Sequence, residues 1–265
     1  MTGFLIGIGA GDLQDRTFFG NRVVLEFSSS SAFTAVFYVT VPSGTSGAPA
    51  VKGGSATVTP GSSATYGALT VEVALPAGDS IVSVTPVGSL RFNSDGFSNT
   101  DPDDSVRKLV RIYSVGNAYT GGISSGGFRN ATSLVEVNLP NCTSVGQSTF
   151  SGCSALKKFV GGSLGIMYDS GFRDCTRLTD FTATRTANIC RTVWNGCSAM
   201  TDLSLPGCSL YYSTSDCLGT MSALQYLRFP DKTLAQVKAM SGYEKSISYR
   251  KGITLVCSDG SQVIT

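Results

Sequence analysis

The chain has 265 residues, a formal net charge of +2, 14% charged residues and no histidine. A chain of this length can bury a large core without a metal or a disulfide, and its balanced charge provides no basic surface for nucleic acid. The lack of histidine removes histidine-dependent triads and nearly all histidine metal sites, which argues against an enzyme. We therefore expect no catalytic residue, no cofactor, no metal and no nucleic-acid partner.

The first third of the chain has the pattern of an antiparallel β-sandwich. The apolar run Phe4–Ile8 lacks the basic start and the length of a signal peptide, so it predicts a strand and no classical export. No apolar stretch reaches the ~20 residues of a membrane span. Five more β-branched runs separated by Gly, Pro and Ser predict strands at 21–27, 32–41, 55–60, 69–76 and 79–87.

These strands assign residues 1–88 to a sandwich domain. The Ser-rich stretch 28–31 and the stretch 42–50 are expected to be loops within it. The second stretch, "PSGTSGAPA", also has the composition of a low-complexity linker.

A 22-residue repeat dominates the following domain, residues 89–230. An aromatic side chain recurs at Phe128, Phe150, Phe172 and Trp194, each 22 residues after the last. Three more columns keep this spacing: Ala131, Cys153, Cys175 and Cys197; Leu134, Leu156, Leu178 and Met200; Val137, Phe159, Phe181 and Leu203. Less regular copies, one containing Phe97, Leu109 and Ile112 and one at Met221–Pro230, flank the clear ones. The sequence therefore predicts a solenoid of four to six rungs with degenerate ends.

The repeat pattern F-x-x-C-x-x-L-x-x-I-x-L-P is plainest in "FSGCSALKKF", "FRDCTRLTDF" and "WNGCSAMTDLSLP". It resembles the BspA-like leucine-rich repeats, over about residues 97–230. The resemblance implies rungs of one strand plus a short helical or irregular return. It also implies the settings of such repeats, which are bacterial surfaces, adhesion and proteins of bacterial viruses. Gly161 and Ala183 stand where the pattern has a large inward residue, which predicts thin rungs there.

Alternation along the repeat strands predicts a polar outward face. In "LVEVNLP", Val137 and Leu139 point inward, so Glu136 and Asn138 must point outward. The 22-residue spacing extends these into two rows: Glu136, Lys158, Asp180, Asp202 and Tyr226; and Asn138, Val160, Thr182, Ser204 and Arg228. Solenoids commonly bind partners on such a face, so we predict a ligand or partner site here. The alternative is that these rows are merely exposed to water.

The last segment, residues 231–265, predicts a cap on the solenoid. Leu234, Val237 and Met240 have helical spacing, and Thr233 precedes them as a possible N-cap. The run "ITLVCSDGSQVIT" that follows predicts a hairpin turning at residues 258–260. The complete fold expected is mainly β, with a sandwich, a leucine-rich-repeat solenoid and a helix and hairpin cap.

Three other patterns are weaker evidence for a site. The in-register cysteines could form disulfides because neighbouring rungs lie ~4.8 Å apart, but small buried thiols are the simpler interpretation. The glycines of Gly7–Gly11 lack the rest of a nucleotide-binding motif. Asp101, Asp103 and Asp104 lack the spacing of a calcium loop, so a solvated loop is expected there.

Three functions remain open. The favoured one is a non-enzymatic structural or attachment protein of a bacteriophage virion, with the sandwich held in the assembly and the repeats presented to the target. The second is a bacterial cell-surface adhesin, and the third is a glycan-cleaving enzyme using two carboxylates. The expected partners are other structural proteins of the assembly, a cell-surface glycan or protein as target, and further copies of the chain in a homo-oligomer.

Overall fold

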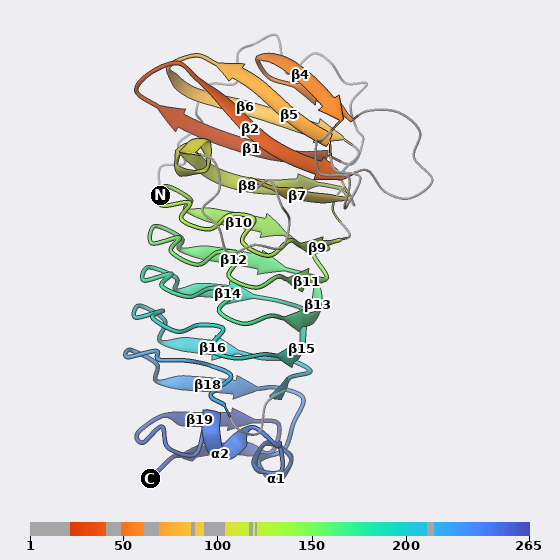
Figure 1. Ribbon diagram of the computed structural model, residues 1–265. Coiled ribbons are helices and arrows are strands. Elements are labelled where there is room, and N and C mark those ends of the chain that lie inside the picture. Colours follow the sequence, from red (N-terminus) through yellow and green to blue (C-terminus); the bar gives the residue numbers. More distant parts are fainter. Residues whose placement is uncertain are drawn as a thin grey trace.

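The computed structural model describes residues 22–40, 49–60, 69–85, 88–92, 104–116, 119, 121–210 and 215–265. The described chain forms a column of β-strands with a sandwich at one end, stacked rungs in the middle and two short helices at the other end (Figure 1). This is the mainly β fold expected from the sequence. The predicted strand at Phe4–Ile8, the glycines at 7–11, most of the loop at 42–50, and Phe97, Asp101 and Asp103 lie outside the described residues.

The N-terminal strands form an antiparallel sandwich, as predicted. One layer contains β1 (Arg22–Ser29), β6 (Gly78–Thr85) and β3 (Ala50–Lys52); the other contains β4 (Ser55–Pro60), β5 (Leu69–Leu75), β2 (Phe33–Thr40) and β7 (Ser89–Arg91). The alternating buried residues of β2 and β5 face the first layer. Phe92 joins the layers, since its ring lies 6.1 Å from Phe27 and 5.7 Å from Phe37.

One sheet runs without interruption from the sandwich into the repeats. Its strand order is β14-β12-β10-β8-β1-β6-β3. The joining strand, β8 (Leu109–Val115), follows the 3-10 helix η1 (Asp104–Lys108), pairs antiparallel with β1 and pairs parallel with β10. Ile112 therefore lies opposite both Leu25 and Val137, and all three are fully buried. The sandwich thereby covers the apolar end of the solenoid, which otherwise would be exposed.

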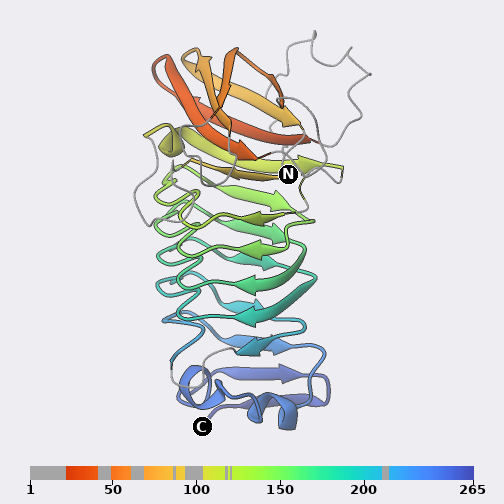
Figure 2. The same ribbon diagram turned by 45° about the vertical axis from the view of Figure 1, so that its right-hand side comes forward.

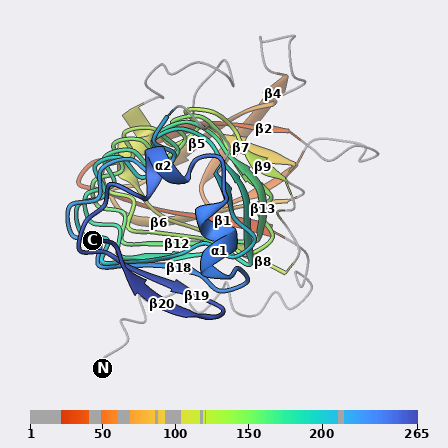
Figure 3. The ribbon, with the colours of Figure 1, turned by 90° about the horizontal axis from the view of Figure 1, so that it is seen from below.

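Each rung of the solenoid has one strand in a front sheet and one in a return sheet. The front strands are β10 (Glu136–Leu139), β12 (Lys158–Gly161), β14 (Asp180–Thr182), β16 (Asp202–Ser204) and β18 (Tyr226–Phe229). The return strands are β9 (Gly122–Ile123), β11 (Ser144–Val145), β13 (Ser163–Met167), β15 (Arg185–Ile189) and β17 (Ser209–Leu210). The rungs superimpose when viewed along the column (Figure 3).

The return of each rung was expected to be helical or irregular, and it instead combines a short strand with an irregular run of turns. The return strands pair in parallel as a five-stranded sheet, whose arrows point the opposite way to those of the front strands in Figure 2. They are two to five residues long and include buried apolar residues such as Leu164, Met167 and Ile189. Such short apolar runs do not distinguish a strand from an irregular turn in the sequence.

The aromatic column is the centre of the core, as predicted. Phe128, Phe150, Phe172 and Trp194 are at most 1% exposed. Successive ring centroids lie 5.5, 5.3 and 6.4 Å apart, with the planes inclined by 18° or less. The ring of Phe159 already occupies the space that a side chain at position 161 would need, because a Cβ added to Gly161 would lie 2.8 Å from that ring.

All eight cysteines are buried and none forms a disulfide. In three consecutive rungs the thiol donates to the carbonyl oxygen of the aromatic residue one rung back. These bonds run from Cys153 to Phe128, from Cys175 to Phe150 and from Cys197 to Phe172, at 3.2, 3.1 and 3.1 Å. The cysteine column is therefore a structural feature that connects rungs.

Titration of these thiols should make the fold less stable in alkali. Burial raises the pKa of Cys142 to about 12 and that of Cys190 to about 11, from the ordinary thiol value of 9.0. The unfolded chain ionises first, so the free energy of unfolding should be constant below pH 9 and fall as pH rises from about 9 to 12. Denaturant unfolding at several pH values across this range measures the free energy of unfolding. Cys142→Ala should make that free energy fall less steeply with pH.

The same burial determines thiol reactivity. At pH 8 the folded protein should react slowly with a thiol reagent, because the thiolate is the reactive form. In denaturant, most or all of the eight cysteines should react. Recovery of two or fewer thiols would contradict this description and indicate disulfides.

The C-terminal cap contains the predicted helix and hairpin. The helix α1 (Leu234–Lys238) has Thr233 as its N-cap. The Thr233 hydroxyl accepts a hydrogen bond from the backbone N–H of Gln236, which completes a capping box. The hairpin strands are β19 (Thr254–Cys257) and β20 (Gly260–Val263), and β19 also pairs in parallel with β18 as an added front strand. A second helix, α2 (Tyr243–Ser246), was not predicted. Within the described residues, no helix has the length and apolar character to cross a bilayer.

Candidate functional site

The candidate site is the front face, defined as the outward side of strands β8, β10, β12, β14, β16 and β18. All nine residues predicted for it lie there and none is buried: Glu136, Asn138, Lys158, Asp180, Thr182, Asp202, Ser204, Tyr226 and Arg228. The predicted rows are in register among β10, β12 and β14 and again between β16 and β18. In the first row Glu136 lies opposite Lys158, and Lys158 lies opposite Asp180. On the next pair of strands Asp202 lies opposite Tyr226. Whether this face binds a ligand stays a prediction.

The front face is divided between β14 and β16, although one continuous surface was expected. The sheet that begins in the sandwich ends at β14, and a separate sheet begins at β16. Asp180 and Asp202 would lie side by side in a continuous ladder, and like charges on directly opposite residues destabilise a sheet. Asp202 instead binds Arg228 on the other side. The rows therefore form two patches, one beside the sandwich and one beside the cap.

The patch beside the sandwich is a chain of alternating charges. Arg111 Nη1 lies 2.9 Å from a Glu26 carboxylate oxygen, and Arg111 Nε lies 4.0 Å from Glu136. Glu136 in turn lies 3.2 Å from Lys158 Nζ. Of the five charged residues predicted for the front face, Glu136 and Lys158 thus have their partners within this patch. Their role includes holding neighbouring strands together, although each exposed pair contributes only ~0 to 1 kcal/mol.

Sequence reasoning missed Arg111 and Glu26. Arg111 precedes the inward Ile112 as Glu136 precedes Val137, so the alternation in "LVRIYSV" contained the necessary information. Glu26 could not be placed in this row, because its position follows from the antiparallel pairing of β1 with β8. That pairing joins two domains that sequence patterns treat separately.

The patch beside the cap centres on Tyr226. Its side chain is 41% exposed on an ordered strand. The Arg228 guanidinium carbon lies 5.2 Å from the centre of the Tyr226 ring, and its Nε donates to both Asp202 oxygens at 2.7 and 2.9 Å. These hydrogen bonds raise the pKa of Arg228. The result is an exposed aromatic ring held beside a fixed ion pair, a combination common in binding surfaces.

The acidic residues considered for a metal do not form such a site in the described chain. Asp104 instead pairs with Arg107 and Lys108, whose hydrogen bonds lower its pKa. Among the described residues, no group of three or more Cys, Asp or Glu has the geometry to hold a metal ion. The front face can supply hydrogen-bond donors, acceptors and an aromatic ring, which are the means of recognition.

Comparisons with known proteins agree with the repeat. The family described as "BspA type Leucine rich repeat region" matches residues 121–244 in 6 copies. A leucine-rich repeat protein of T. pallidum is similar at 18% identity and a TM-score of 0.39, over 62% of this chain and 79% of that one. One from Bacteroides ovatus has 14% identity and a TM-score of 0.20, over 66% and 68%. No curated protein sequence matches.

The matched residues include all the clear copies of the repeat and extend into the cap. They begin at residue 121, later than the expected start near residue 97. On its 22-residue columns and on the family match, the solenoid of this chain is a BspA-type leucine-rich repeat region.

Proposed function

We propose that this chain is a non-enzymatic attachment protein that recognises its target with the front face of the repeats. The observation that carries the proposal is the register of the polar rows: residues 22 or 24 apart in sequence become neighbours on a stiff sheet. A rigid array of exposed polar side chains loses little conformational freedom on binding. The sandwich, fused through β8 to the same sheet, would hold this array in position.

A phage virion is the proposed location, and the bacterial cell surface is the alternative. The Gly, Ser and Thr content and the sandwich joined to a repeat array support a structural component. Tail and capsid genes beside this one would favour the virion, whereas a secretion cluster would favour the adhesin. Antibodies raised against the purified chain and viewed by immunogold electron microscopy should label purified particles in the first case and the surface of intact cells in the second.

The glycan-cleaving alternative has less support. It needs two carboxylates about 5 to 10 Å apart, flanking a bond in a cleft. On the front face, Glu136 is paired with Lys158 and Asp202 is hydrogen-bonded to Arg228. Release of reducing sugar from cell-wall or capsular glycans by the purified chain would revive this alternative and contradict the attachment proposal.

Tyr226→Ala should weaken binding to target cells at least about tenfold, the loss expected for an exposed aromatic anchor. The matched control is Tyr168→Ala, since Tyr168 is equally exposed, at 44%, but follows β13 on the return side. Binding of labelled protein to cells, measured by flow cytometry, compares the two. Equal binding by both variants would contradict a front-face site.

Two other obvious variants are poorer tests of the front face. Arg228→Ala would release the Asp202 carboxylate as well as remove a contact. Deleting residues 1–88 would remove β1 and leave the paired edge of β8 and its buried residues exposed. A loss of assembly in that deletion would therefore not separate attachment from misfolding.

A further inference from the structure

The last strand of the cap, β20, is exposed along its whole length. None of its four residues is buried or half-buried, and the side chain of Val263 is 52% exposed. β20 is the outermost strand of its sheet and pairs only with β19. Figure 3 shows it lying beyond the stacked front strands. One side of its backbone therefore forms an open sheet edge.

This edge lacks the features that keep sheet edges from pairing. Proteins protect an edge by keeping it very short, or by placing proline or charged side chains on it. Among the described strands, six other edges have two or three residues each, namely β3, β7, β9, β14, β16 and β17. The remaining edge, β4, contains Pro60. The sequence of β20, Gly-Ser-Gln-Val, contains neither charge nor proline, so this edge is left able to pair.

The free hydrogen-bonding groups of the edge belong to Ser261 and Val263. Ile264, which follows β20, donates its N–H to the Ile253 carbonyl and accepts from the Gly252 N–H. Both of these partners lie on the side of β19. Successive residues of an antiparallel strand direct their N–H and C=O groups to alternate sides. Ser261 and Val263 therefore direct theirs away from β19, towards the open edge.

A second copy of β20 fits this edge in one register. A two-fold axis perpendicular to the sheet and passing beside Gln262 places Gln262 opposite its own copy. Ser261 then lies opposite Val263 of the other copy, and each such pair exchanges N–H to C=O bonds in both directions. Every free backbone group of the edge is thereby satisfied. Ser261 and Val263 lie opposite the outward residues of β19, so the outward faces of both copies lie on one side.

We propose that two copies of this chain pair through β20 as an antiparallel, two-fold dimer. The dimer joins the columns at their cap ends, whereas each sandwich lies at the far end of its column (Figure 1). The sheets of the two caps become one, which places the two Tyr226 rings on the same face, roughly 24 Å apart at ~4.8 Å per strand. The dimer itself does not depend on the proposed recognition function. If the front face binds a target, the dimer presents two cap patches at once and raises the avidity.

The dimer should depend on protein concentration. One short strand pair buries much less than the ~1,200 Å² of a stable interface, so a weak association is expected. In sedimentation equilibrium of the full chain, the average mass should rise from that of a monomer towards twice that mass between about 1 and 500 µM. It should not rise further, because an isologous contact closes once both edges are paired.

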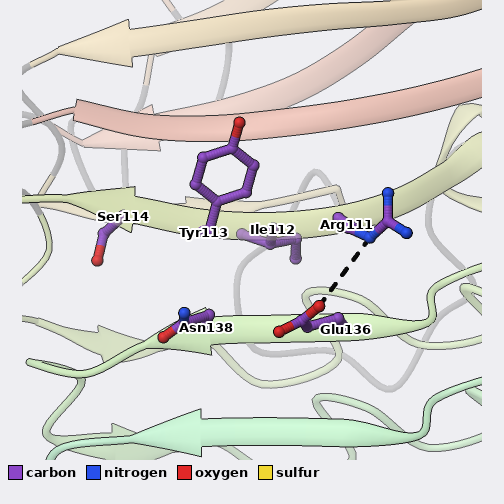
Figure 4. A pocket seen from close by; sticks show the side chains of 6 residues that line it. All are labelled: Arg111, Ile112, Tyr113, Ser114, Glu136 and Asn138. Atoms are coloured by element: carbon purple, nitrogen blue, oxygen red, sulfur yellow. Dashed lines mark ion pairs between the residues drawn. The ribbon is translucent and has the colours of Figure 1, made fainter. Parts of the chain in front are cut away.

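Position 262 provides the specific test, because the two-fold axis places it opposite itself. Gln262→Lys and Gln262→Glu should each weaken the dimer at least about tenfold, since like charges would be directly opposed. An equimolar mixture of the two variants should restore the dimer, because the opposed charges then attract. Contacts of this kind already occur in the protein. Arg111 and Glu136 lie directly opposite on β8 and β10 and form an ion pair (Figure 4).

The matched control is Ser209→Lys, which adds a charge at an exposed position of another sheet edge, β17, and should dimerise like wild type. Thermal unfolding of both position-262 variants at about 1 µM, where the chain is expected to be monomeric, should match wild type, since Gln262 is exposed. Recovery of the dimer in the mixture would also show that both variants are folded.

Three results would overturn the pairing of β20. The first is a wild-type chain that stays monomeric up to about 500 µM, which would leave the edge open to a strand of a different protein. The second is a dimer that Gln262→Lys and Gln262→Glu leave unchanged. The third is a mixture of these variants that associates no better than either alone. Recognition by the front face is judged separately, by the binding of Tyr226→Ala to cells.

Discussion

Phe172→Ala should lower the free energy of unfolding by about 3 to 5 kcal/mol, the largest effect expected of any single change in the solenoid. Phe172 is fully buried, and its ring lies within 6.4 Å of Phe150, Phe159, Phe181 and Trp194. Truncation leaves a cavity that two adjacent rungs and the front sheet would have to fill. Denaturant unfolding followed by circular dichroism measures the change.

The control for this cavity is Tyr168→Ala, which removes an exposed aromatic ring and should change stability by less than about 0.5 kcal/mol. Phe150→Ala should resemble Phe172→Ala, because it occupies the same column one rung earlier. A cost below about 1 kcal/mol for both buried rings would show that the stacked column is not formed.

Arg250→Met should lower the free energy of unfolding by about 3 kcal/mol, through loss of the cap. The Arg250 side chain is 6% exposed and lies 3.0 Å from an Asp216 oxygen. Its guanidinium also donates to the carbonyl oxygens of Gly219, at 2.7 Å, and Ser246. It therefore ties α2 to the last turn of the solenoid. Methionine replaces the volume but leaves these carbonyls without the guanidinium donor and removes the positive charge beside the Asp216 carboxylate.

A second arginine–aspartate pair provides the control. Arg191 lies 2.8 Å from Asp169 with two contacts to the same oxygen, but its side chain is 53% exposed. Arg191→Met should therefore cost at most about 1 kcal/mol. Hydrogen exchange should also show faster exchange in α2 and around residues 216–219 for Arg250→Met alone. Equal stability losses in the two variants would refute the idea that burial makes Arg250 important.

The front face shows which features the 22-residue spacing predicts and which it does not. The spacing of 22 residues correctly predicted that Glu136, Lys158 and Asp180 form one row. It did not predict the division between β14 and β16, although Ala183, which follows β14, departs from the repeat pattern. At this division no strand pairing joins β14 to β16, and Asp202 is hydrogen-bonded to Arg228 on its other side.

The sequence by itself determined the front strand of each rung, the inward columns, most strands of the sandwich and the N-cap at Thr233. These features depend on residues close in sequence or repeated at a constant interval, so periodicity reveals them. Only the tertiary structure decided how β1 joins β8 and that the return strands form a second sheet. Antiparallel pairing between separate domains leaves no periodic pattern, because its register is set by the packing of both cores at once.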